Sequence, residues 1–285
     1  MIKHIFSTIA GSSRELLRNW RALIILLLLY VAMLCAVYLF FATREATVAQ
    51  LIETFAVGIL TPLLFFAIQM MALRYSAPNQ RLLSLLGGSL RDSWKLIVIS
   101  LPLILLAVLI VYSLGGIEFK EVEQAVRAAP LPPRPPAPKS APPLQWQALA
   151  LTSLEYLLLC VAIPLAAMHL WIATARDGLK SALRGAGRSL GRAFAPGAVM
   201  TYAIGFAVFA VIPYFIVFSK TTGASTWTDI GFLGVRLAVA VIVSLTGWVI
   251  TLGALSPLAA EAALSADESA AEPAGPEGKQ APLLP

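Results

Sequence analysis

Long uncharged stretches recur along the chain, separated by short segments that carry most of its charges. One such stretch runs from Ala22 to Ala42, and 20 uncharged residues separate Glu53 from Arg74. A helix needs roughly 20 apolar residues to cross the hydrocarbon core of a bilayer. The pattern predicts spans at about residues 20–42, 46–74, 96–117, 146–176, 196–219 and 232–260. We therefore expect an all-α, polytopic membrane helix bundle that forms a single domain over residues 1–264.

The segments between the spans follow different patterns. Residues 1–20, 75–95 and 177–194 place basic and apolar side chains at helical spacing, which predicts amphipathic helices at the membrane interface. Residues 118–145 are predicted to form a linker, because eight prolines stand between Pro130 and Pro143 and favour extended chain over helix. The tail, residues 265–285, is rich in Ala, Pro and Glu and is predicted to be disordered.

Basic residues divide unequally between the two sides of the predicted membrane. The segments on the side of the N-terminus hold 14 Lys and Arg residues, and those on the opposite side hold 7. Loops that stay in the cytoplasm carry the excess of Lys and Arg. We therefore expect a multi-pass protein of the bacterial inner membrane, with both termini cytoplasmic and the proline-rich linker outside.

The second and fourth predicted spans match at a constant offset of 102 residues. The matching pairs are Glu53 with Glu155, Pro62 with Pro164, and Arg74 with Arg176. Each of these two spans is followed by an amphipathic segment and then by another span. This predicts a parallel internal repeat whose unit is a span, an amphipathic helix and a second span.

The residue composition limits the kinds of catalytic or metal site that the chain can form. The chain is 59% hydrophobic and 13% charged, with two cysteines and two histidines. These are too few and too scattered for a metal centre or a disulfide framework, so we expect no metal or cofactor. We find no nucleophile with a partnering base and no paired acids, so we expect a protein that is not an enzyme. Nucleic-acid binding is not expected either, because the basic residues are spread over several short loops.

Five polar side chains in or near the spans are candidates for function. They are Glu53, Glu155, Arg236, His169 and Gln69. Charged groups inside a membrane are costly and often mark an ion path or an ion pair. We expect Glu53, Glu155 and Arg236 near the outer ends of their spans, with Arg236 paired to one or both glutamates. That pair fits a structural role better than transport, while His169 and Gln69 could form hydrogen bonds between helices.

A basic stripe follows the fourth span. Its members recur every four residues and are Arg176, Lys180, Arg184, Arg188 and Arg192. Like charges at this spacing weaken an isolated helix. An anionic leaflet offsets that repulsion, so these five residues are candidate contacts for anionic lipid at the inner leaflet. Ordinary anchoring by positive charge explains most of the pattern.

The order of a proline-containing span, an amphipathic segment ending in Ser89 to Lys95 and another span resembles a bacterial membrane family. It looks like the membrane domain found beside some glycerophosphodiester phosphodiesterases, and like stand-alone relatives of unassigned function. The resemblance covers roughly residues 50–220. It implies a membrane domain of six helices without an active site of its own, and it carries over no catalytic residue.

Two classes of function follow from these patterns. The first is a non-enzymatic membrane protein that organises lipid or an unidentified protein partner. The alternative is a transporter of small molecules or lipid that uses the interface between the two repeats. An intramembrane enzyme ranks behind both.

Overall fold

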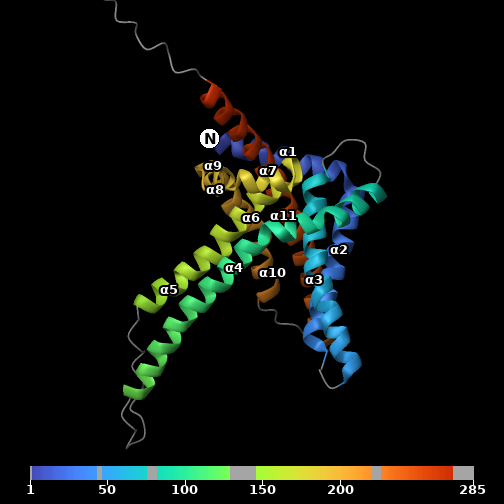
Figure 1. Cartoon of the computed structure of the whole chain (residues 1–285). Helices are drawn as coiled ribbons and strands as arrows, with labels where there is room; N and C mark the ends of the chain where they lie inside the picture. Colours follow the sequence, from blue (N-terminus) through green and yellow to red (C-terminus); the bar gives the residue numbers. More distant parts are fainter. Residues whose placement is uncertain (1, 44–46, 76–81, 129–145, 220–225, 272–285) are drawn as a thin grey trace, which may run out of the picture. The chain divides into compact units, whose positions relative to one another are not determined.

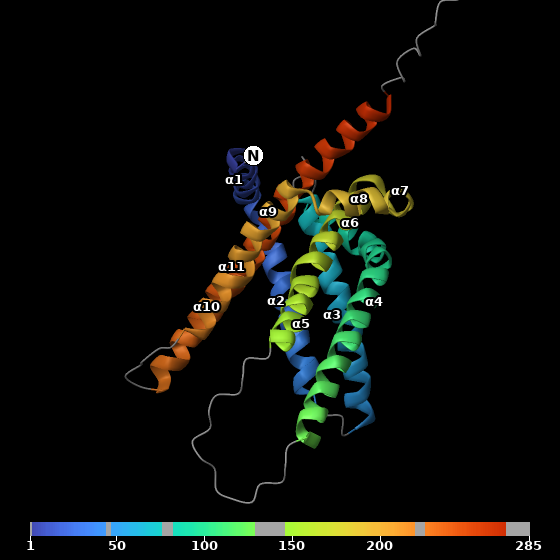
Figure 2. The ribbon, with the colours of Figure 1, turned by 90° about the vertical axis from the view of Figure 1, so that its left-hand side faces the viewer.

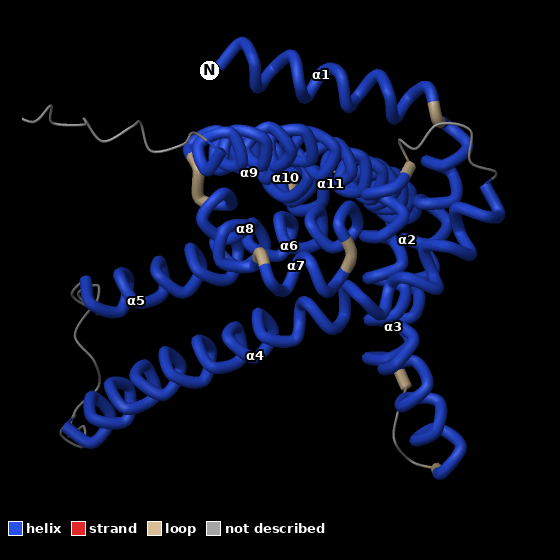
Figure 3. The backbone as a smooth tube through the Cα atoms, turned by 45° about the horizontal axis from the view of Figure 1, so that its top comes forward, coloured by secondary structure: helices blue, strands red, loops and turns tan. Residues whose placement is uncertain are grey.

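The chain is helical throughout the part that the structure describes. The computed structural model describes residues 2–43, 47–75, 82–128, 146–219 and 226–271, which are 96% helical and contain no strand (Figures 1 and 3). The elements in chain order are α1 (Ile2–Arg18), α2 (Trp20–Ala42), α3 (Val48–Arg74), α4 (Leu82–Ala128), α5 (Trp146–Leu157), the π-helical η1 (Leu158–Ala162), α6 (Ile163–Asp177), α7 (Leu179–Arg184), α8 (Ala186–Ala193), α9 (Pro196–Phe206), the π-helical η2 (Ala207–Val211), α10 (Ile212–Phe218) and α11 (Thr226–Ala271).

Six helical stretches are long and apolar enough to cross a membrane. Within the described residues they are Trp20–Ala42, Val48–Arg74, Leu83–Leu114, Leu149–Asp177, Pro196–Phe218 and Trp227–Ala259. Their number, order and approximate bounds agree with the spans predicted from the uncharged stretches. The all-α, polytopic architecture is therefore confirmed.

The chain divides into two compact units, which are described separately. One unit contains Leu16–Phe194, and the other contains Met1–Glu15 together with Ala195–Pro285. We call them the α2–α8 unit and the α9–α11 unit.

The core of the α2–α8 unit lies where the carboxyl end of α3 and the first three turns of α6 meet the beginning of α4. Every residue from Phe66 to Ala72 and from Leu165 to Ile172 is buried. Phe66 and Trp171 meet edge to face there, with ring centroids 6.0 Å apart. The amino half of α3 is largely exposed, which is the pattern expected where lipid covers apolar side chains.

Within this unit, α4 and α5 lie side by side (Figures 1 and 2), and Figure 1 shows them diverging from α2 and α3 with increasing distance from the core. The buried face of α4 is confined to its first five turns, and from Leu101 onward its described side chains are exposed or half-buried. The tight packing of the unit is therefore concentrated at one end of its spans.

In the α9–α11 unit, small residues allow the helices to approach closely. A Cβ atom added at Gly205 would clash with the side chain of Thr251, and one added at Gly247 would lie 3.1 Å from Cβ of Phe209. Close backbone approach through glycine is typical of helix association in membranes.

Prolines are accommodated in two ways. Pro62, Pro102 and Pro257 lie inside α-helices, whereas Pro164 and Pro213 each follow a π-helical segment. Proline has no N–H and its ring crowds the carbonyl four residues earlier, and a π-turn relieves this by inserting an extra residue. Pro62 and Pro164, which match in the predicted repeat, therefore sit in different local geometry. The internal repeat stays a prediction.

Two predicted boundaries are wrong. The linker was expected from residue 118, but α4 continues to Ala128; the tail was expected to be disordered from residue 265, but α11 continues to Ala271. Both extensions consist largely of helix-forming residues such as Ala and Glu, and both stop two residues before the next proline, Pro130 or Pro273. The rest of the predicted linker and tail lies outside the described residues.

The predicted interfacial helices are also arranged differently from one another. From Leu82 onward, the segment 75–95 is the beginning of α4 rather than a separate helix. The segment 177–194 forms two short helices, α7 and α8, separated by Gly185. Gly178 precedes α7 with a φ of 81°, a conformation that favours glycine.

Candidate functional site

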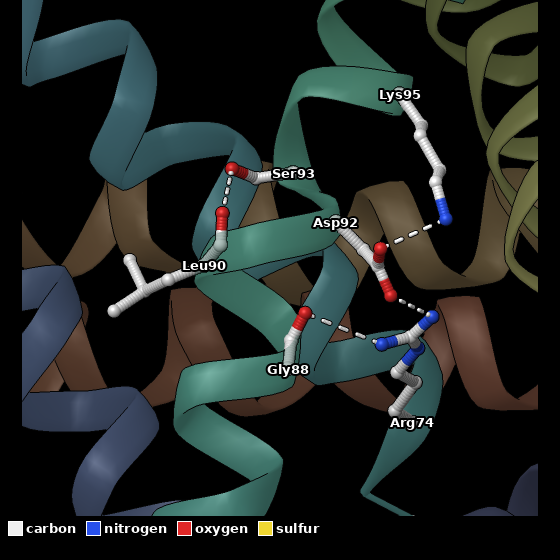
Figure 4. Close-up of polar contacts among 6 residues, drawn as sticks. All are labelled: Arg74, Gly88, Leu90, Asp92, Ser93 and Lys95. Carbon is white, nitrogen blue, oxygen red and sulfur yellow. Dashed lines mark hydrogen bonds and ion pairs between the residues drawn. The ribbon is translucent and has the colours of Figure 1, made fainter.

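One carboxylate in the α2–α8 unit binds two cations from different spans (Figure 4). Asp92 accepts a hydrogen bond from Nη2 of Arg74 at 2.8 Å through one oxygen, and from Nζ of Lys95 at 2.8 Å through the other. We call Arg74, Asp92 and Lys95 the Asp92 cluster. It carries a formal charge of +1.

The Asp92 cluster is positioned by the end of α3 and the beginning of α4. Arg74 is the last residue of α3, while Asp92 and Lys95 stand three residues apart on α4 and so share one face of that helix. Nη1 of Arg74 also donates to the carbonyl of Gly88, at 3.4 Å. The cluster therefore ties the two helices together by side-chain contacts.

A neighbouring hydrogen bond brings a third helix to the same place. Nδ2 of Asn19, the residue between α1 and α2, donates to the carbonyl of Tyr75 at 3.2 Å. Tyr75 follows Arg74 and caps α3. A carbonyl at the end of a helix lacks an intrahelical partner, and the Asn19 amide supplies one.

Exposure within the Asp92 cluster is graded. The Asp92 side chain is 11% exposed, against 28% for Arg74 and 31% for Lys95. The carboxylate therefore lies inward and the two cations lie toward the surface. Charge-assisted hydrogen bonds of this kind are shorter and stronger than neutral ones.

The sequence analysis missed this cluster, although a signal for it was present. Asp92 is the only acidic residue between Arg74 and Lys95, and it stands three residues before Lys95. The sequence analysis grouped the basic residues of this segment as membrane anchors and did not consider what the lone carboxylate would bind. That Arg74 is its other partner depends on how α3 packs against α4.

The two uncharged candidates, His169 and Gln69, are both buried in the core of the α2–α8 unit. Nδ1 of His169 lies 3.0 Å from the carbonyl of Leu165, which belongs to the same helix. One hydrogen bond between helices at this level comes from Trp171, whose Nε1 donates to Oγ of Ser100 at 2.7 Å. Sequence reasoning did not single out either of these two residues.

The three charged candidates do not form one site within either unit. Glu53 is exposed on α3 and Glu155 is half-buried on α5, both in the α2–α8 unit. Arg236 belongs to the α9–α11 unit, where its Nη1 donates to the carbonyl of Ser219 just after α10. This contact caps the end of a helix, and it gives no support to the predicted pair with a glutamate.

The basic stripe begins at the end of α6, with Arg176, and continues on α7 and α8. Nε of Arg176 contacts Oδ1 of its neighbour Asp177 at 3.3 Å, with both side chains exposed. Lys180, Arg184 and Arg188 are exposed, and Arg192 is half-buried. No acidic residue occurs between residues 178 and 194, and none of the described acidic side chains is paired with these four cations.

A cavity of about 180 Å³ opens between α2 and α3 in the α2–α8 unit. Its lining consists of Val37, Phe40, Phe41, Gly58, Thr61 and Pro62. The hydroxyl of Thr61 donates to the carbonyl of Val57 at 2.9 Å, so its proton is already used within α3 and the surface facing the cavity is largely apolar. Such a surface fits a hydrocarbon chain and offers no group for chemistry.

Comparisons with known proteins add no assignment. No protein-family model, no curated protein and no solved structure matches this chain. The resemblance to the membrane domain beside glycerophosphodiester phosphodiesterases therefore stays a prediction. Within the described residues, no three side chains of His, Cys, Asp or Glu gather to hold a metal ion.

Proposed function

We propose that this chain is a non-enzymatic membrane protein that organises anionic lipid at one face of the bilayer, and with it a protein partner. The six apolar helices support an integral membrane protein. The lipid-organising role is supported chiefly by the α7–α8 surface, which we define by Lys180, Arg184 and Arg188.

Charge on the α7–α8 surface is unneutralised by the described part of the chain. Its three cations are exposed, and the segment between residues 178 and 194 has no acid to balance them. The apolar side chains of Leu183, on α7, and Phe194, directly after α8, are also exposed. Basic and apolar side chains together suit the interface of an anionic leaflet, at about 1 kcal/mol per basic residue.

A lipid-selectivity measurement tests the proposal. The full chain is reconstituted in bilayers of phosphatidylcholine and phosphatidylglycerol, and spin-labelled lipids report the relative affinity of each headgroup for the protein surface. We expect the variant Arg184→Gln/Arg188→Gln to lose at least about threefold in its preference for phosphatidylglycerol. The removed charges are the ones that attract the headgroup.

The matched control is Arg134→Gln/Lys139→Gln, which removes the same charge from the predicted outer linker. It should leave the preference unchanged when the labelled lipid is confined to the leaflet predicted to be cytoplasmic. Equal losses in the two variants would refute the α7–α8 surface as a lipid-organising feature.

Transport is the second candidate, and the observation that favours it is the burial of Gln69 and His169 within one core. Intramembrane polar residues often mark a substrate path. Uptake of a labelled substrate into liposomes that depends on both side chains would favour this candidate over the first.

A further inference from the structure

The cations of the Asp92 cluster stand at the ends of two spans. Arg74 closes the run of 20 uncharged residues that follows Glu53, and Lys95 directly precedes the uncharged residues 96–117. Because roughly 20 helical residues cross the hydrocarbon core, residues that bound such runs lie at the depth of the lipid headgroups. Both cations are therefore expected at the depth of lipid phosphate.

The fold brings these two cations to a single point. Asp92 binds Arg74 with one oxygen and Lys95 with the other, as Figure 4 shows. Unaided, a guanidinium and an ammonium group would repel each other. The shared carboxylate removes that cost and leaves one net positive charge.

Donors remain available on the exposed side of the cluster. Arg74 uses Nη2 for Asp92 and Nη1 for the carbonyl of Gly88, and its Nε makes no described contact. The Lys95 ammonium has three protons, of which Asp92 accepts one. Both cations are about three times as exposed as the carboxylate between them. An anion reaching the cluster from outside thus meets the cations first.

The same turn of α4 carries apolar side chains on the side away from the cluster, as Figure 4 shows for Leu90. Leu90 is 48% exposed and Trp94 is 51% exposed, and they stand one helical turn apart. Tryptophan is enriched where the membrane meets water, because its ring is apolar and its N–H is polar. Trp94 therefore places this turn of α4 at the depth of the lipid headgroups, where the phosphate within reach belongs to lipid.

We propose that Arg74 and Lys95 together bind the phosphate group of an anionic membrane lipid, with Asp92 holding the two cations in place. The planar guanidinium of Arg74 would donate N–H groups to phosphate oxygens, and the ammonium of Lys95 would donate a further hydrogen bond. This site lies on α3 and α4 and does not depend on the α7–α8 surface. The two proposals can therefore fail independently.

The test uses the full chain in detergent and native mass spectrometry, with phosphatidylglycerol and phosphatidylcholine as the added lipids. We expect Lys95→Gln to weaken binding of the first phosphatidylglycerol about fivefold, because one of the two donors to phosphate is lost. Binding of phosphatidylcholine should not change. Lys95→Arg keeps the charge and should retain at least half of the affinity.

Arg91→Gln is the matched control, because Arg91 is exposed on the same helix, one residue from Asp92, and has no described ion pair. It should change the affinity by less than twofold. Arg74→Gln should match Lys95→Gln. If loss of Arg74 prevents folding, Lys95→Gln decides the matter, since it leaves the Arg74–Asp92 pair intact.

Equal losses in Arg91→Gln and Lys95→Gln would overturn the proposal, because they would indicate diffuse attraction by surface charge. Displacement of the lipid by millimolar inorganic phosphate would assign the cluster to a soluble anion and overturn the lipid assignment. A loss confined to Arg184→Gln/Arg188→Gln would also overturn it, while leaving the α7–α8 surface intact as a lipid contact.

Discussion

At the scale of single residues, the Asp92 cluster shows that one carboxylate can change the role inferred for nearby basic residues. Arg74 and Lys95 fit the pattern of membrane anchors when they are considered alone. In the structure they are held by Asp92, which is less exposed than either of them. By contrast, the contact of Arg176 with Asp177 joins two adjacent, exposed side chains. Exposed pairs contribute little to stability, whereas removing one partner from a sheltered pair is costly.

This contrast predicts different effects for two equivalent substitutions. Asp92→Asn should lower the free energy of unfolding by about 1–2 kcal/mol, because two neighbouring cations lose their shared partner. The apparent melting temperature of the detergent-purified chain should fall by roughly 3–6 °C. Asp177→Asn is the matched control and should change it by less than about 2 °C. Similar shifts in the two variants would mean that the Asp92 cluster does not join α3 to α4.

At the scale of helices, the most informative feature is how a proline-containing span satisfies its backbone. Pro213 has no N–H and follows the π-helical η2, in which Ile212 bonds the carbonyl five residues earlier, so the α-helical hydrogen bond from position 213 to the carbonyl of Phe209 is not made. Oγ of Ser244, on α11, donates to that carbonyl. Proline is tolerated in spans when a neighbouring side chain repairs the freed group in this manner. The hydrogen bond also fixes α11 against η2.

A double-mutant cycle tests this repair. Ser244→Ala should destabilise the chain by about 0.6–1 kcal/mol, the usual contribution of a hydrogen bond between membrane helices. In a Pro213→Ala background the same change should cost less, because an N–H at position 213 allows a regular α-helical turn to form in place of η2, and in that turn it bonds the carbonyl of Phe209. Thr246→Ala serves as the control, since the Thr246 hydroxyl donates within its own helix. Equal costs of Ser244→Ala in both backgrounds would contradict the repair.

The ends of α4 and α11 are set by the local sequence and not by the ends of the predicted spans. Both α4 and α11 continue beyond their predicted spans, to Ala128 and Ala271, and each stops two residues before a proline. Charge patterns mark where a helix leaves the hydrocarbon, but the helix itself ends where the backbone can no longer continue it. A linker or tail that is predicted to begin soon after the uncharged run ends therefore begins too early.

At the scale of the whole molecule, the distribution of Lys and Arg predicts the orientation in the membrane. We expect a cysteine introduced at Arg134 to react with a membrane-impermeant maleimide in intact cells, and one introduced at Leu284 to react only after lysis. Cys35 and Cys160 are first replaced by serine. The asymmetry of 14 basic residues against 7 is the physical reason. Labelling of position 284 in intact cells would reverse the predicted topology and move the α7–α8 surface to the outer leaflet.

The sequence by itself determined the class of this protein. Uncharged stretches of about 20 residues can satisfy their backbone in lipid only as helices, so the number and order of the spans follow from local composition. The basic character of the segment that forms α7 and α8 is also a property of the sequence, since residues 178–194 contain no acid, but the breaks at Gly178 and Gly185 mean that one helical period does not set how its cations are arranged.

Only the tertiary structure decided which polar groups meet. Arg74 and Asp92 stand 18 residues apart, Ser100 and Trp171 stand 71 apart, and Phe209 and Ser244 stand 35 apart. No local pattern relates such positions, because their contacts depend on the rotation and crossing of packed helices, which small residues such as Gly205 set. The lipid-phosphate site proposed for Arg74 and Lys95 arises at this level.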